Sequence, residues 1–79
     1  MENKLIEFIA DLLCINKEDL NSNTDLLDLC IFDYVEFFDI IVSIEEEFKI
    51  TLAEDEIDDI EHIRTIGKIN NILKEKTEA

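Results

Sequence analysis

Few residues in this 79-residue chain have side chains that could do chemistry. Cys14 and Cys30 could act as nucleophiles or zinc ligands, and His62, the only histidine, could act as a base. A catalytic thiol needs a base beside it, and zinc sites use paired Cys or His ligands. The two cysteines are sixteen residues apart, and His62 stands at no motif spacing from either. The sequence therefore predicts no metal site and no enzyme.

The carboxylates are the more informative group. Seven Lys and Arg stand against 21 Asp and Glu, which gives a net charge of −14. Residues 33–61 hold twelve of the carboxylates and one cation, Lys49, so this segment carries −11 of that charge. Such a chain repels nucleic acid and anionic membrane surfaces over the distance that salt screening allows. We therefore expect a basic protein surface as its partner, and neither nucleic acid nor a membrane.

The elements that would position these groups are helical. Apolar residues recur every three or four positions over residues 3–14, again from 33 to 48, and again after Arg64 and Thr65. Asp33 is a good N-cap for the second helix, with Glu36 as a capping-box partner. Residues 54–61 add a short acidic helix, and the segment between residues 15 and 32 reads as a long loop. The sequence predicts an all-α bundle of three long helices and one short helix, with a long first loop.

Length and composition point to one domain over residues 1–79, acting as a monomer. The chain has no proline and a single glycine, Gly67, which favours helices over strands. Its N-terminal segment lacks the basic start and apolar core of a secretory signal, and no apolar run is long enough to span a membrane. We expect a cytoplasmic protein whose two cysteines are free thiols.

Two segments resemble the acyl carrier protein family: "DYVEFFDIIVSIEEEFKITL" and "IRTIGKINNIL". Members of this family show Asp-Ser-Leu at the start of their second helix, acidic residues after it, and Glu-Glu-Glu-Phe at its end. In this chain the pattern falls without a gap on Asp33, Tyr34, Val35, Glu36, Asp39 and residues 45–48. The resemblance covers nearly the whole chain in element order and implies the acyl-carrier bundle.

The chain departs from the family at the residue that matters most. The family's serine accepts a 4′-phosphopantetheine arm, and Tyr34 stands in its place. An alignment that starts from Asp28 instead places Asp33 there, with Cys30 near the family's glycine. Neither alignment offers an aliphatic hydroxyl, so we expect Tyr34 to be unmodified and the chain to hold no cofactor. Under the alternative interpretation, a working carrier would hold 4′-phosphopantetheine at an unusual attachment site.

The resemblance also implies a partner surface on the second helix. Carried over position by position, Glu36, Asp39, Glu45 and Glu46 would meet Arg and Lys of a partner, with Val35 and Phe37 as the apolar contacts. Alternatively, Phe37 and Tyr34 cover the long loop. The leading hypothesis is an acidic docking module that binds a basic enzyme of acyl or thioester metabolism. A third hypothesis is an acidic adaptor that shares only the fold.

Overall fold

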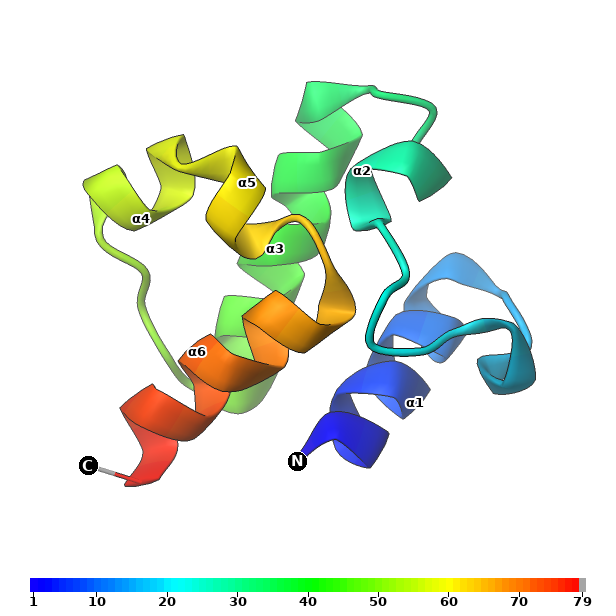
Figure 1. Cartoon of the computed structure of the whole chain (residues 1–79), viewed down its shortest axis with the longest axis horizontal. Coiled ribbons are helices and arrows are strands. Elements are labelled where there is room, and N and C mark those ends of the chain that lie inside the picture. Colours follow the sequence, from blue (N-terminus) through cyan, green and yellow to red (C-terminus); the bar gives the residue numbers. More distant parts are fainter. Residues whose placement is uncertain (79) are drawn as a thin grey trace.

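The computed structural model describes residues 1–78, and in them it shows helices joined by short connections (Figure 1). They are α1 (Glu2–Leu13), the 3-10 helix η1 (Lys17–Asp19), α2 (Leu26–Leu29), α3 (Tyr34–Phe48), α4 (Glu54–Asp58), α5 (Ile60–Ile63) and α6 (Ile66–Glu78). The predicted all-α bundle is confirmed, with α1, α3 and α6 as its three long helices. The only β-type pairing in this part of the chain is an isolated bridge between Asp25 and Thr65.

Two details of the prediction are wrong. The long first loop contains a short helix, α2, because the Asp25 carboxylate accepts hydrogen bonds from the N–H groups of Leu27 and Asp28 and so caps it. The single helix predicted for residues 54–61 is broken into α4 and α5 around Asp59. Apolar residues at 57, 60 and 63 drift by about 120° around one continuous helix, so the break lets all three contact the core.

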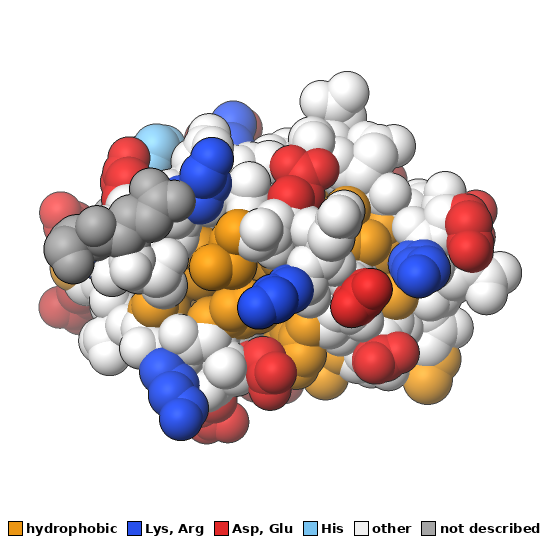
Figure 2. All heavy atoms as spheres, turned by 90° about the horizontal axis from the view of Figure 1, so that it is seen from below, with side chains coloured by type: hydrophobic (Ala, Val, Ile, Leu, Met, Phe, Trp, Pro, Cys, Tyr) orange, Lys and Arg blue, Asp and Glu red, His pale blue; other side chains and the backbone are white. Residues whose placement is uncertain are grey.

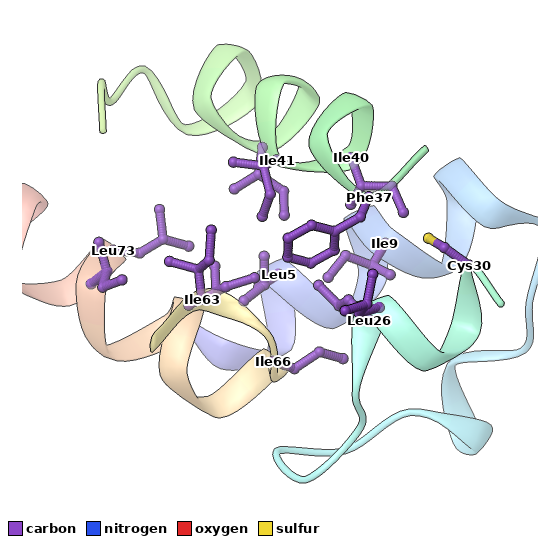
Figure 3. Packing of buried hydrophobic residues seen from close by; sticks show 14 of the residues in the cluster. Leu5, Ile9, Leu26, Cys30, Phe37, Ile40, Ile41, Ile63, Ile66 and Leu73 are labelled. Carbon is purple, nitrogen blue, oxygen red and sulfur yellow. The ribbon is translucent and has the colours of Figure 1, made fainter. Parts of the chain in front are cut away.

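The core is built around Phe37, whose ring points from α3 into the space between α1, α2 and α5 (Figure 3). Its side chain is 0% exposed. The prediction that Phe37 supplies an apolar contact to a partner is therefore wrong. Phe37 shares the inward face of α3 with residues three, four and seven positions later, namely Ile40, Ile41 and Ile44.

The first loop is fastened to the junction of α5 and α6, which lies beside it in Figure 1. The Leu26 N–H donates to the Arg64 carbonyl oxygen (2.8 Å), and the Ile66 N–H donates to the Thr24 carbonyl oxygen (3.1 Å). The Gly67 N–H donates to the Ser22 carbonyl oxygen (2.9 Å). These bonds between segments about forty residues apart hold the loop across the core.

One ion pair strengthens the same junction. The Arg64 Nε donates to Asp25 Oδ2 at 2.6 Å, and Arg64 Nη1 donates to Glu61 Oε1 at 2.9 Å. Partial burial alone would raise the pKa of Asp25, but the hydrogen bonds from Arg64 and from two backbone N–H groups outweigh it and hold the pKa below its ordinary value. The hydrogen bond to Asp25 raises the pKa of Arg64. Asp25 thus caps α2 and anchors the loop at once.

Charges of both signs share the face that lies at the bottom of Figure 1. Seen from that side, Lys and Arg side chains lie among Asp and Glu side chains around a band of apolar ones (Figure 2). An ion pair joins Lys76 to Glu56 at 3.1 Å, and a backbone N–H bond from Ala53 together with Lys76 lowers the pKa of Glu56. None of the helices in residues 1–78 is long and apolar enough to cross a membrane.

Gly67→Ala tests the contact between loop and α6. Alanine normally favours a helix over glycine by about 1 kcal/mol. A Cβ at residue 67, however, would lie 3.0 Å from the Ser22 carbonyl oxygen and 3.3 Å from its Cβ. We expect crowding to win and the free energy of unfolding to fall by about 1 kcal/mol, measured by urea denaturation. Asn71→Ala, at an exposed position of the same helix, is the control and should not destabilise. A Gly67→Ala variant as stable as the parent would show that the loop can move away.

Asp25→Asn tests the ion pair, because asparagine keeps the N-cap and removes only the charge. The pKa of Asp25 is lower in the folded state, so its stabilising effect is full above its ordinary value of 3.8 and is lost as pH falls through the folded value. We expect the parent to be more stable than Asp25→Asn at neutral pH, with the difference shrinking below about pH 4. Thermal unfolding of both proteins between pH 3 and 7 measures it. A difference that does not change with pH would contradict the role given to the charge.

Candidate functional site

The start of α3 is fixed by Asp33, as the sequence predicts. Its Oδ1 accepts hydrogen bonds from the N–H groups of Val35 (3.0 Å) and Glu36 (3.3 Å), which makes Asp33 the N-cap. The return bond expected from Glu36 does not form, because the Asp33 N–H donates instead to the Cys30 carbonyl oxygen at 3.0 Å. Tyr34 is then the first residue of the helix, and half of its side chain is exposed.

Other candidate nucleophiles lie elsewhere or are held by neighbours. The Ser43 hydroxyl donates to the Asp39 carbonyl oxygen at 3.0 Å, one turn back in α3, and the Ser22 hydroxyl donates to Glu2 at 2.8 Å. Cys30 is buried at the end of α2 (Figure 3), and both cysteines are free. Burial, followed by the nearby carboxylates of Glu36 and Asp33, raises the pKa of the Cys30 thiol. A thiol with a raised pKa is a poor nucleophile at neutral pH.

The outer face of α3 carries a stripe of alternating apolar and acidic side chains. Val35, Asp39, Val42 and Glu46 follow one another at intervals of four, three and four residues, so they lie on one side of the helix, and all four are exposed. Glu36 is exposed beside the first turn of this stripe. The partner surface predicted from the sequence does not include Val42, although its spacing of seven from Val35 indicates that both lie on the same side of the helix.

Glu45 stands apart from this stripe. Its Oε2 accepts a hydrogen bond from the Leu52 N–H at 2.7 Å, and its side chain is half-buried. This bond closes the connection that follows α3, because the Leu52 N–H has no helical partner. The structure thus brings together Val35, Glu36, Asp39 and Glu46 of the predicted partner surface, and gives Glu45 and Phe37 positions within the fold.

Within residues 1–78, no group of three or more His, Cys, Asp or Glu side chains is arranged to hold a metal ion. The dense carboxylates of α4 and α5 point into solvent: Glu54, Asp55, Asp58, Asp59 and Glu61 are all exposed.

Comparisons with known proteins agree with the resemblance. A family model described as "Phosphopantetheine attachment site" matches residues 3–69. The chain is 28% identical over 78 residues to an acyl carrier protein of Clostridium perfringens, with 99% of each chain covered. It is 29% identical to the acyl carrier protein of Petrotoga mobilis, covering 92% of this chain and 82% of that one. The acyl carrier protein of Clostridium acetobutylicum is 28% identical, with 95% and 94% covered.

The expectation of no cofactor is therefore wrong, because the matching family and the acyl carrier proteins indicate a 4′-phosphopantetheine group. The first turn of α3 does not fit that group attached to serine. It consists of Tyr34, Val35 and Glu36 after the N-cap Asp33, and none of these side chains has the aliphatic hydroxyl that carries the group in a serine carrier. The chain belongs to the acyl carrier protein family, whose matching model describes a phosphopantetheine attachment site.

Proposed function

We propose that this chain is an acyl-carrier-type module that docks, through the outer face of α3, on a basic surface of an enzyme of acyl or thioester metabolism. The observation that carries the proposal is the exposed stripe of Val35, Asp39, Val42 and Glu46, with Glu36 beside it. The membership of the acyl carrier protein family supports an enzyme of acyl or thioester metabolism as the partner.

The physical argument rests on the two faces of α3. The inner face is fully used by the core, with Phe37 and three isoleucines buried, so the fold gains nothing from the outer stripe. Val35 is 73% exposed, and Val42 is 48% exposed, each beside a carboxylate. Apolar contacts flanked by charges are the usual make-up of a transient protein interface. The carboxylates steer a cationic partner and fix its orientation, and the valines supply the buried contact.

Charge reversal on α3 tests the docking. The double variant Glu36→Lys with Asp39→Lys should weaken binding to a basic partner by about tenfold or more, because a like-charge contact replaces an attractive one. Proteins captured from the native cell are identified, purified and titrated against each variant at low and high salt. Circular dichroism should show unchanged helicity, since both side chains are exposed.

The control is Asp11→Lys with Glu18→Lys, which makes the same change in net charge. Asp11 and Glu18 are exposed and line a shallow hollow between α1 and η1. If both double variants lose binding equally, net charge alone drives association. If neither loses it, the binding surface lies away from α3.

A second candidate function, a working carrier with an unusual attachment site, is favoured by the family match itself. We propose that residue 34 is the position equivalent to the attachment serine. Support comes from the gap-free pattern between Asp33 and Phe48, and from the place of Tyr34 as the first residue of α3 with a half-exposed side chain. A phenol oxygen stands several bonds farther from the backbone than a serine hydroxyl, so the geometry at this position differs from that of a serine carrier.

Tyr34→Ser tests the position. After incubation with coenzyme A and a broad-specificity phosphopantetheinyl transferase, we expect Tyr34→Ser to gain one arm that peptide mapping places on residue 34. The capped helix start is already present, so the substitution supplies only the missing hydroxyl.

Tyr34→Phe is the matched control and should gain nothing at residue 34. Modification of Asp33→Ser but not of Tyr34→Ser would move the equivalent position to residue 33. Mapping of the arm on protein from the native cell then shows which residue holds it in the unaltered chain.

A further inference from the structure

Most of the large apolar side chains that are exposed in the described residues lie in one short segment. Eight large apolar side chains are exposed in the described residues, and five of them fall between residues 29 and 35: Leu29, Ile31, Phe32, Tyr34 and Val35. Ile31 is 88% exposed and Phe32 is 53% exposed. Apolar residues scattered singly over a surface need no explanation, but a cluster such as this one marks a contact site.

The turn between α2 and α3 holds two of these residues in an unfavourable backbone conformation. The φ angles of Ile31 and Phe32 are 52° and 58°. The Ile31 N–H donates to the Asp28 carbonyl oxygen (3.0 Å) and the Phe32 N–H to that of Leu27 (2.9 Å), an arrangement in which helices commonly end on a glycine. A β-branched residue is a marked outlier in this region, because its Cβ crowds the following carbonyl.

The side chains of these two residues contribute little packing that could offset the backbone strain. The Ile31 side chain is almost fully in solvent, so no packing compensates its conformation. The Phe32 ring is 53% exposed, and the Arg64 guanidinium lies over it, 5.6 Å from its centroid. Strained residues whose side chains do not serve the core are typical of sites that act on another molecule.

We infer that Ile31 and Phe32 form an apolar anchor that enters an apolar patch ringed by Lys and Arg on a partner protein. The partner's chemistry follows from the rim of the anchor, where Asp28, Asp33 and Glu36 are exposed. An apolar centre inside an anionic rim is complementary to an apolar centre inside a cationic one. The anchor rests on the proposed docking of α3, and Val35 makes its surface continuous with the stripe on that helix.

The probe is a synthetic amphipathic helix with Leu on one face and Lys around it, titrated against the full chain. A matched peptide has Ser in place of Leu. Ile31→Gly should weaken binding of the Leu peptide about tenfold, because one buried apolar side chain is lost. The same variant should raise the midpoint of thermal unfolding by about 4 °C, since glycine relieves the strain. Binding of the Ser peptide should not change.

Two further variants separate the effect of losing the apolar side chain from the effect of relieving backbone strain. Ile31→Asn should also lose binding, because asparagine tolerates the left-handed conformation but is polar. Lys49→Gly removes the same kind of strain, at a φ of 57°, at the far end of α3, about 22 Å from its start. Lys49→Gly should raise the midpoint of thermal unfolding without weakening the binding of the Leu peptide. We therefore expect Ile31→Gly to raise the thermal midpoint and weaken binding of the Leu peptide, and Lys49→Gly to raise the thermal midpoint only.

The possible outcomes separate failure of the anchor from failure of the docking through α3. Unchanged binding of the Leu peptide by Ile31→Gly would refute the anchor. An equal loss for both peptides would also refute it, because the substitution would then act by disturbing the arrangement of the carboxylates and not by removing an apolar contact. If the double variant Glu36→Lys with Asp39→Lys loses binding of the Leu peptide and Ile31→Gly keeps it, the docking through α3 is supported and the anchor is refuted. If Ile31→Gly loses binding of the Leu peptide and the double variant keeps it, the anchor is supported and docking through the acidic stripe is refuted. Co-sedimentation with phosphatidylcholine vesicles that Ile31→Gly abolishes would replace the protein partner with a membrane.

Discussion

The attachment of the first loop to the junction of α5 and α6 is the constraint on which the rest of the structure depends. About twenty residues separate α1 from α3, and they contain only η1 and α2, which are too short to be held by their own helical hydrogen bonds. Three backbone hydrogen bonds and the pair of Asp25 with Arg64 hold this stretch in place. Because Asp25 also caps α2, one side chain sets both the path of the loop and the start of the helix that follows it.

The position of α2 in turn decides what the start of α3 can present. The end of α2 forces the chain through Ile31 and Phe32 in left-handed conformations, and Asp33 then caps α3. Arg64 contacts both ends of the segment from Asp25 to Phe32, since it binds the Asp25 carboxylate and lies against the ring of Phe32. One residue of the exposed apolar cluster, Phe32, thus lies against the same side chain that binds Asp25 in the first loop.

The negative charge of the chain destabilises the folded state and would at the same time attract a cationic partner. With a net charge of −14, repulsion among the carboxylates favours expansion of the chain. Only a few of the carboxylates whose side chains the structure describes are in ion pairs, among them Asp25 with Arg64 and Glu56 with Lys76. Most of the others remain free on the surface, where they would attract a cationic partner over about 10 Å at moderate salt.

The sequence by itself determined the long helices, the cap at Asp33 and the kinship with acyl carrier proteins, because capping and apolar periodicity act between residues close in the chain. It did not decide which apolar residues of α3 face inward. Phe37 and Val42 look alike in a helix that is apolar around much of its circumference, and only packing against α1, α2 and α5 buried the first and left the second exposed. The capping of α2 and the left-handed turn at Ile31 likewise escaped prediction. The hydrogen bonds that form both features are local. The contacts of Arg64 with Asp25 and with the ring of Phe32, which tie these features to the rest of the fold, join residues far apart in the chain, so local sequence cannot report them.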